Sequence, residues 1–306
     1  MKLYLRRVCF FLLPIALACV ALELMLRRIP NDYSHKRNYL DKNSRQIEVL
    51  FLGSSHAFYG IDPLFLETRA FNAAYVSQTL HYDFEILKKY EGRWDRFRYV
   101  VLAVDYFSLY NNLHESVESW RVKNYNIYWG INDSYRIADH LELFANKPSV
   151  SVDRLTGYYS GHKSAITTSE LGRGPKRSSL SNEAFLTAGA AAAKRHTYNL
   201  EHFDENVAVL EEIIDFAKAN DAKVLLYTSP ADPTYYRNLE RRQQTRNSSV
   251  LHEMDSVNEH VQYVNFLENP AFTRDDFWDP DHLNENGARK LTIMIGNLIR
   301  SPNSTP

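Results

Sequence analysis

The stretch that decides the fold reads Ile47-Glu48-Val49-Leu50-Phe51-Leu52-Gly53-Ser54-Ser55-His56. Its first half is mostly branched or aromatic, which is typical of a short buried strand. Gly53 ends the apolar run, and two hydroxyl side chains and an imidazole follow it directly. In open α/β sheets, ligands bind in the crevice outside the carboxyl ends of the strands. The stretch therefore predicts a strand that brings polar side chains to the ligand-binding edge of a parallel sheet.

Strands and helices alternate through the rest of the chain. The segments 97–104 and 223–227 are nearly continuous apolar runs, as expected for strands buried on both faces. Apolar residues at helical spacing follow Asp204, which we expect to cap that helix. We expect five strands, at 47–52, 70–74, 97–104, 223–227 and 261–266. We expect helices at 81–90 and about 236–257, two more that begin at 62 and 204, and a last helix that includes 288–299. This order predicts an α/β fold, a three-layer α/β/α sandwich around a central parallel sheet.

The N-terminal region is strongly apolar. Val8 to Met25 spans eighteen residues and contains one formal charge, at Glu23. A helix needs roughly 20 residues to cross the bilayer core, so we expect residues 1–28 to form a membrane anchor that contacts the bilayer through residues 8–25. Basic residues before the run favour a cytoplasmic N-terminus, although Arg27 and Arg28 follow it. The chain is then a single-pass membrane protein whose large domain lies outside the cytoplasm, in the periplasm or at the cell surface.

Two other interpretations of this region stay open. Ala16-Leu17-Ala18 resembles a signal-peptidase site, which would make the region a cleaved signal, but apolar residues continue as far as Met25. A buried helix of a soluble protein is the other alternative. Both cysteines, Cys9 and Cys19, lie in this region, so the rest of the chain cannot form an internal disulfide.

The polar stretch 29–45 is expected to be a linker, and residues 46–306 to form the α/β domain. Within that domain the pattern becomes irregular at about 106–199, which we interpret as an insertion. It is rich in tyrosine and contains Trp120 and Trp129. These aromatic residues could form the wall of a substrate cleft, or they could simply pack as core or lid.

Composition and motifs exclude several classes of partner. The chain has 36 basic and 37 acidic residues, a formal net charge of −1, so no overall field attracts nucleic acid. Its histidines do not show the spacing of zinc sites, and it contains neither a phosphate-binding loop nor a dinucleotide-binding glycine motif. We therefore expect no metal, no cofactor and no nucleic-acid partner.

A second polar group precedes the last helix and reads Asp279-Pro280-Asp281-His282. An aspartate three residues before a histidine can accept from one ring nitrogen while the other nitrogen faces a nucleophile. Serine needs such a base because its hydroxyl is a weak nucleophile at its ordinary pKa. We therefore expect Ser55 as nucleophile, His282 as base and Asp279 as the residue that orients it. For His56 a structural role is favoured over that of the base, and for Asp281 a loop or cap role over that of the orienting residue.

Gly53-Ser54-Ser55 followed by Asp279-Pro280-Asp281-His282 resembles the SGNH (GDSL-like) hydrolase superfamily, in which a Gly-Asp-Ser block ends the first strand and an Asp-x-x-His block precedes the last helix. The resemblance spans the globular region and implies the same three catalytic residues and an SGNH (flavodoxin-like) fold. Ser54 stands where the family has aspartate. That replacement is similar to membrane-anchored members that act on envelope polymers, including the D-alanyl-lipoteichoic acid transfer proteins.

The oxyanion hole is the part of the family pattern that this chain matches least. The Ser55 backbone N–H is available at the strand-to-helix turn. The family's second block supplies a glycine N–H, and the matching region here offers Ser77 and Gln78 instead. Where the family has an asparagine side chain, this chain has Asp105, which cannot donate when ionised.

The expected function is that of a serine esterase or O-acyltransferase acting on acyl esters, with an acylated cell-envelope glycan or a small ester as substrate and possibly a membrane protein as acyl-transfer partner. The glycan follows from the family resemblance. Two alternatives remain: a catalytically degenerate domain that binds a polymer or scaffolds a membrane assembly, and a lipase or thioesterase whose insertion serves as a lid.

Overall fold

The computed structural model describes residues 1–145, 147–161 and 163–300. The chain divides into two compact units. The first, here called the anchor unit, consists of Met1–Asn38 and Val117–Thr167, and the second, the sheet unit, consists of Tyr39–Ser116 and Thr168 to the C-terminus. The expected insertion 106–199 is therefore shared between the two units.

The sheet unit is built on one parallel sheet with the strand order β2-β1-β3-β4-β5. The strands are β1 (Val49–Leu52), β2 (Ala70–Asn72), β3 (Tyr99–Ala103), β4 (Lys223–Thr228) and β5 (Val261–Asn265). The chain moves outward from β1 in one direction to β2 and in the other to β3, so the order reverses at β1. Ligands of open α/β sheets bind at such a reversal. The prediction of a central parallel sheet is confirmed.

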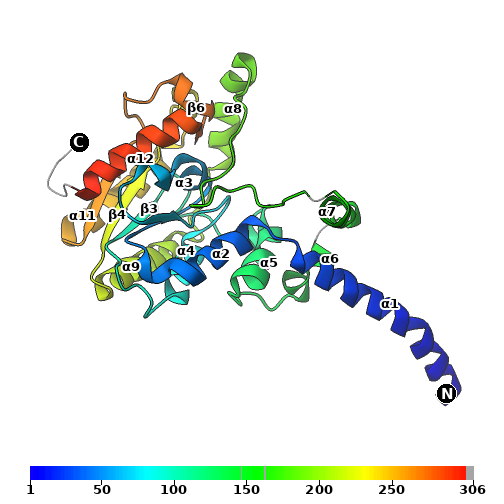
Figure 1. Cartoon of the computed structure of the whole chain (residues 1–306). Helices are drawn as coiled ribbons and strands as arrows, with labels where there is room; N and C mark the ends of the chain where they lie inside the picture. Colours follow the sequence, from blue (N-terminus) through cyan, green and yellow to red (C-terminus); the bar gives the residue numbers. More distant parts are fainter. Residues whose placement is uncertain (146, 162, 301–306) are drawn as a thin grey trace. The chain divides into compact units, whose positions relative to one another are not determined.

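Helices cover both faces of this sheet. Figure 1 shows α3 (Ser55–Gly60) and α12 (Glu285–Arg300) on one face and α4 (Leu80–Lys89) and α9 (Phe203–Ala219) on the other. The remaining helices of the unit are α8 (Asn182–Arg195), α10 (Pro233–Tyr236) and α11 (Arg241–Val257). A short antiparallel pair, β6 (Phe277–Asp279) and β7 (His282–Leu283), precedes α12. The three-layer prediction is confirmed.

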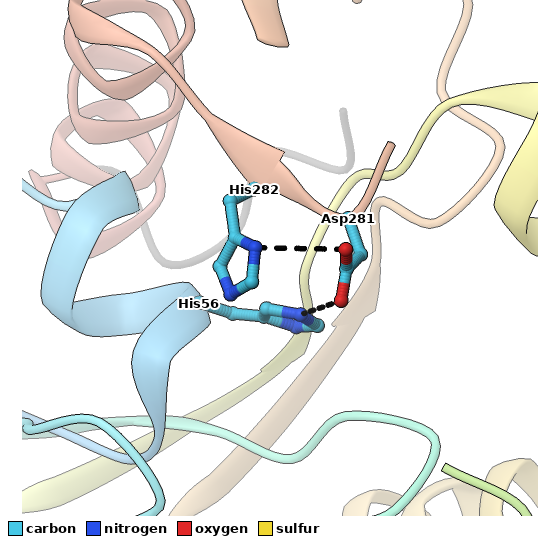
Figure 2. Close-up of side chains that lie close together, drawn as sticks. All are labelled: His56, Asp281 and His282. Carbon is cyan, nitrogen blue, oxygen red and sulfur yellow. Dashed lines mark ion pairs between the residues drawn. The ribbon is translucent and has the colours of Figure 1, made fainter. Parts of the chain in front are cut away.

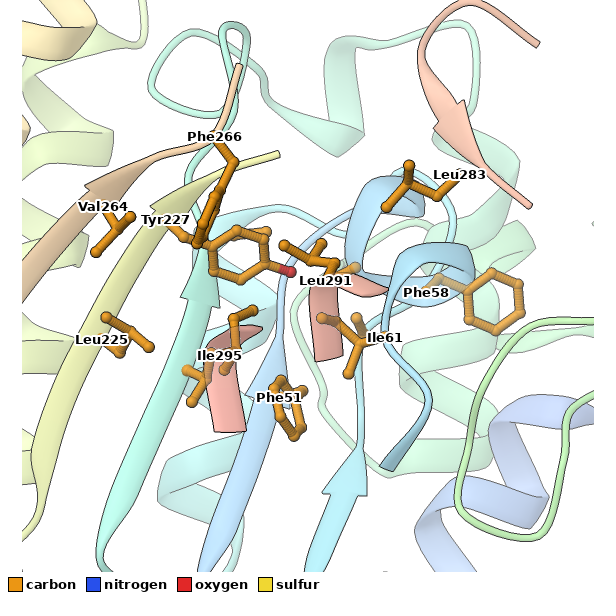
Figure 3. Close-up of a cluster of buried hydrophobic side chains, with 14 of the residues drawn as sticks. Phe51, Phe58, Ile61, Leu225, Tyr227, Val264, Phe266, Leu283, Leu291 and Ile295 are labelled. Carbon is orange, nitrogen blue, oxygen red and sulfur yellow. The ribbon is translucent and has the colours of Figure 1, made fainter. Parts of the chain in front are cut away.

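One apolar cluster joins the sheet to α3 and α12 (Figure 3). Phe51 of β1 and Tyr227 of β4 are fully buried, as are Leu291 and Ile295 of α12. Successive residues of a strand point to opposite faces, and Leu50 and Leu52 are buried against the other layer. The strand that precedes Ser55 is therefore fixed from both sides.

Two local expectations differ from the structure. The helix expected at about 236–257 starts later, at Arg241 of α11, because the carboxylate of Glu240 caps it by accepting from the backbone N–H of Arg242 and Gln243. Asp204 does not cap α9, which begins one residue earlier. The expected linker 29–45 contains the helix α2 (Asp32–Asn43).

The anchor unit contains α1 (Lys2–Arg28), followed later in the chain by α5 (Val122–Asn124), α6 (Glu142–Ala145) and α7 (Pro148–Tyr159). Among the helices of the described residues, α1 alone is long and apolar enough to cross a membrane, with a mean hydropathy of 2.5 over its most apolar window. By length and composition it matches the expected anchor.

Replacement of Leu291 by alanine tests the packing of α12 on the sheet. Leu291 is fully buried, so the variant loses apolar contacts and leaves a cavity. We expect the free energy of unfolding in mild detergent to fall by about 2–5 kcal/mol. Val257→Ala is the control, because Val257 is 77% exposed and its loss should change stability by no more than about 0.5 kcal/mol. Equal losses in both variants would contradict this packing.

Candidate active site

The turn after β1 requires glycine. Gly53 has φ +119°, and a Cβ at this position would lie 2.9 Å from the Cβ of Ala103 on the neighbouring strand β3. A side chain is therefore excluded both by the backbone conformation and by the close approach of the two strands. The chain leaves the sheet at this point, and Ser55 follows as the first residue of α3.

The structure brings the three residues of the expected triad together. The Nε2 atom of His282 lies 2.8 Å from Ser55 Oγ, although the two residues are 227 positions apart in the chain. The other ring nitrogen, Nδ1, lies 3.0 and 3.1 Å from the two carboxylate oxygens of Asp279. These are hydrogen-bond distances from hydroxyl to imidazole and from imidazole to carboxylate.

The loop between β6 and β7 holds Asp279 in place. Its Oδ1 atom accepts from the backbone N–H of Asp281 at 3.1 Å and of His282 at 2.9 Å. The same oxygen also faces the His282 ring. A tight turn of four residues thus positions both the orienting carboxylate and the imidazole, which is the physical reason for the Asp-x-x-His spacing.

A second set of charged side chains lies directly beside the triad. Figure 2 shows the carboxylate of Asp281 between the rings of His282 and His56. Its Oδ1 is 3.5 Å from His282 Nδ1, and its Oδ2 is 3.6 Å from His56 Nε2. On the far side of His56, Nδ1 lies 3.0 Å from Asp105 Oδ2. Asp105 in turn accepts from the backbone N–H of Ser229 at 2.9 Å.

These buried groups are charged because they pair with one another. Burial disfavours the imidazolium of His56, but the carboxylates of Asp105 and Asp281 outweigh that cost and raise the pKa of His56 to about 10. Burial would raise the pKa of Asp105, yet His56 and the Ser229 N–H hold it below its usual range. The pKa of Asp281 is lowered in the same way, against its burial, by His282, His56 and His196. One cation therefore stands between two anions.

The structure refines two expectations about this region. His56 is buried and turned toward two carboxylates, in keeping with a structural role. Asp281 lies in the loop between β6 and β7, as expected, and its carboxylate is buried among histidines, including His196 at 3.8 Å. Burial lowers the pKa of His196 to about 4, so this third imidazole is neutral at neutral pH.

His56, Asp281 and His282 also lie close enough together to hold a metal ion, with one ligand atom from each within 4.8 Å of the others. However, Nδ1 of His282 is already within 3.0 Å of Asp279, and an ion would compete for that nitrogen. His56 is likewise balanced by a carboxylate on each side. The arrangement fits a network of paired charges better than a metal centre.

The expected oxyanion donors are placed unequally. The Ser55 N–H lies in the first turn of α3, where backbone N–H groups have no partner within the helix. Ser77 has φ +60°, a backbone conformation that favours glycine. The side-chain amide of Gln78 is engaged elsewhere, since its Nε2 donates to Asp83 Oδ1 at 2.6 Å.

Two buried residues near the turn carry structural roles that the sequence did not reveal. Asn72 donates from its side-chain amide to the carbonyls of Ala57 at 2.8 Å and Ile61 at 3.0 Å, which ties the end of β2 to α3. Asp83 accepts from the Gly53 N–H at 2.9 Å and lines a cavity of about 10 Å³, roughly the space for one water molecule. The sequence does not reveal these contacts, because a polar residue inside a helix or strand can face many different partners.

Aromatic residues enclose the His282 imidazole. The ring of Trp278 stacks on His282 with centroids 5.1 Å apart, and Tyr59 meets the same imidazole edge-on at 5.6 Å. The guanidinium of Arg177 lies over both aromatic rings and donates to the Tyr59 hydroxyl at 3.1 Å. Arg177 belongs to the predicted insertion, so part of that insertion does border the site.

Comparisons with known proteins give distant structural matches. No protein-family model and no curated protein sequence matches this chain. A provisionally assigned platelet activating factor from Streptococcus pneumoniae is 10% identical, with a TM-score of 0.46 over 95% of this chain and 99% of that one. A GDSL-like lipase from Bacteroides thetaiotaomicron is 12% identical, with a TM-score of 0.44 over 88% and 99%. A provisionally assigned acylhydrolase from Bacteroides fragilis is 13% identical, with a TM-score of 0.39 over 92% and 94%.

Asp83 predicts a pH-dependent cost to stability. Burial raises its pKa to about 7, so the folded chain keeps this proton while the unfolded chain loses it near pH 4. The unfolded state binds fewer protons in this window, and stability therefore falls as the pH rises from about 4 to about 7. Asp83→Asn keeps an acceptor for Gly53 but cannot ionise. Over this window it should gain stability relative to the wild type by up to roughly 4 kcal/mol.

The measurement is denaturant unfolding of the two proteins between pH 4 and roughly pH 7.5. Measurements about one pH unit apart are enough to follow a pKa shift of this size. Glu67→Gln is the matched control, because the Glu67 side chain is 83% exposed. A difference between Asp83→Asn and the wild type that is the same at every pH would rule out a titrating Asp83.

Proposed function

We propose that this protein is a membrane-anchored serine hydrolase of the SGNH type that acts as an esterase or O-acyltransferase on acyl esters. The observation that carries the proposal is the hydrogen-bonded series from Ser55 Oγ to His282 Nε2 and from His282 Nδ1 to Asp279. A serine at the carboxyl edge of a parallel sheet, joined to a base that a carboxylate orients, is the arrangement that nucleophilic acyl transfer needs.

In this mechanism Ser55 Oγ attacks the ester carbonyl while His282 Nε2 takes its proton. Asp279 accepts the Nδ1–H hydrogen bond, which fixes the tautomer in which Nε2 is free to act as base. When the tetrahedral intermediate collapses, His282 gives the proton to the departing alcohol, and the acyl group remains on Ser55. Water or a sugar hydroxyl then attacks the acyl-enzyme with His282 again as base.

The proposed substrate is an acylated glycan of the cell envelope, and a membrane protein that supplies or receives acyl groups is the corresponding partner. Support comes from the apolar helix α1, which would hold the site near a membrane outside the cytoplasm. The Gly53-Ser54-Ser55 block gives further support, since it resembles envelope-modifying members of the family. Arg177 and the aromatic rings of Tyr59 and Trp278 form a polar and aromatic border to His282, which suits a glycan better than a long acyl chain.

A catalytically degenerate domain that binds a polymer is the second candidate. It is favoured by the side chains near the expected oxyanion hole, because Asp105 is paired with His56 and Gln78 donates to Asp83. Each missing oxyanion donor costs on the order of 10²–10³ in rate in measured enzymes. Normal function in cells after replacement of both Ser55 and His282 would favour this candidate.

Labelling with a fluorophosphonate probe tests the nucleophile. We expect the wild type to be labelled and Ser55→Ala not to be, with esterase activity on p-nitrophenyl acetate reduced at least about 10³-fold, because no other oxygen faces His282 Nε2 at hydrogen-bond distance among the described residues. Ser54→Ala is the matched control, since Ser54 is the preceding hydroxyl and is buried. Equal labelling of wild type and Ser55→Ala would exclude Ser55 as nucleophile.

Asp281 and His56 should act on the pH profile in opposite directions. Asp281→Asn removes an anion that lies 3.5 Å from His282 Nδ1, so the acidic limb of kcat/KM should move to lower pH. His56→Gln removes a cation, so the same acidic limb should move to higher pH. We expect a shift of roughly one pH unit for each variant. The charged and titratable groups around this pair are Asp105, His196, Asp279, His282, Tyr227 and Tyr235.

The profile is measured with p-nitrophenyl acetate for both variants and for Glu67→Gln, an exposed charge change that should leave it in place. A role of Asp281 and His56 in packing alone would lower the rate without moving the limb. Shifts in the same direction would likewise contradict the charge assignment.

A further inference from the structure

Within the anchor unit, the segment Val117–Thr167 packs on the last turns of α1. The carboxylate of Glu23 accepts from the first backbone N–H groups of α6, at 3.0 Å from Glu142 and 2.9 Å from Leu143. The hydroxyl of Tyr159, at the end of α7, donates to the carbonyl of Met25 at 3.0 Å. The Arg27 guanidinium donates to the carbonyl of His140. Four hydrogen bonds thus join this segment to residues 23–27.

These contacts fix the depth of the segment relative to a membrane that α1 crosses. The apolar run Val8–Met25 contains eighteen residues. At about 1.5 Å per residue it spans roughly 27 Å, close to the roughly 30 Å of the hydrocarbon core. Glu23 and Met25 then lie at one boundary of that core. Because the start of α6 is bonded to Glu23 and the end of α7 to Met25, these two ends lie at the same boundary.

Exposed apolar side chains are concentrated in the same segment. Among the described residues of Val117–Thr167, eight large apolar side chains are exposed: Val117, Trp120, Tyr135, Ile137, Phe144, Val150, Val152 and Tyr159. The sheet unit also exposes eight, although the segment has less than a quarter of its length. Isolated exposed apolar residues are ordinary, but a concentration of them marks an interaction surface.

We propose that Val117–Thr167 is a second membrane contact, which lies in the interface of the bilayer that α1 crosses and places Ile137, Phe144 and Val152 between the lipid headgroups. Phe144 follows Leu143, whose backbone N–H donates to Glu23. Ile137 lies in the short helix Ile137–His140, whose last carbonyl accepts from Arg27. Aromatic and aliphatic side chains beside basic residues suit this zone. Arg28 ends α1 beside this segment, and the Arg136 side chain is 69% exposed, although it also pairs with Asp139 at 3.8 Å.

The lipid bilayer is the occupant because the segment is bonded to the anchor at the depth where the bilayer ends. A second protein or a second copy of the chain could also cover these side chains. Neither alternative, however, follows from the hydrogen bonds that hold the segment at the boundary of the bilayer. This inference does not depend on the proposed catalytic activity.

Fluorescence quenching in vesicles tests the contact. The full-length chain, with Cys9 and Cys19 replaced by alanine, receives one cysteine at Ile137, Phe144 or Val152 and a bimane label. The protein is reconstituted into phosphatidylcholine and phosphatidylglycerol vesicles that contain either a lipid spin-labelled near the headgroup or aqueous iodide. Cysteines at Val257 and Ile293 of the sheet unit are matched controls, because both side chains are exposed. A chain that keeps Cys9 reports whether α1 is inserted.

We expect the lipid quencher to reduce the fluorescence at the three segment positions at least about twofold more than at Val257 and Ile293, with the reverse order for iodide. The proposal is overturned if the segment positions are quenched by iodide as strongly as the controls while Cys9 is quenched by lipid. Protection from both quenchers would indicate a protein partner and would also overturn it. Absence of lipid quenching at Cys9 would remove the spanning helix on which the depth argument depends.

Discussion

The close approach of β1 and β3 at Gly53 is the constraint on which the site depends. With only 2.9 Å between Ala103 Cβ and the position of a Gly53 Cβ, only glycine fits where the chain turns out of the sheet. The turn makes Ser55 the first residue of α3 and leaves its N–H and its hydroxyl at the edge of the sheet. Asp83 fixes the same turn from the other face by accepting from the Gly53 N–H.

A second constraint is the cost of burying charge. Isolated buried ions are expensive, and the structure meets this cost by placing His56 between Asp105 and Asp281. Asp281 therefore keeps its negative charge beside the Nδ1 atom of His282, which already has Asp279 as its nearest acceptor. The triad thus stands in an electrostatic environment that reaches back to β3 through Asp105 and to the end of β4 through Ser229.

Local sequence patterns predicted the structure accurately where a single residue type determines a turn. Gly53 after an apolar run located the end of β1, and the spacing of Asp279 and His282 located a tight turn that joins carboxylate and imidazole. They failed where the deciding contact came from elsewhere in the chain. Asp281 lies in the predicted loop, but its pairing with His56 was not visible because His56 lies more than two hundred positions earlier. The helix predicted to start near Tyr236 starts only after Glu240, because the Glu240 side chain caps it there.

The sequence by itself determined the parallel α/β architecture, the apolar helix at the N-terminus and the three residues of the proposed triad, because hydrophobic period and turn chemistry are local properties. Only the tertiary structure decided that Ser55 and His282 meet at 2.8 Å, that His56 and Asp105 form a buried ion pair, and that the segment Val117–Thr167 is bonded to the end of α1. Each of these depends on strand order and on packing between distant segments, which no local pattern encodes.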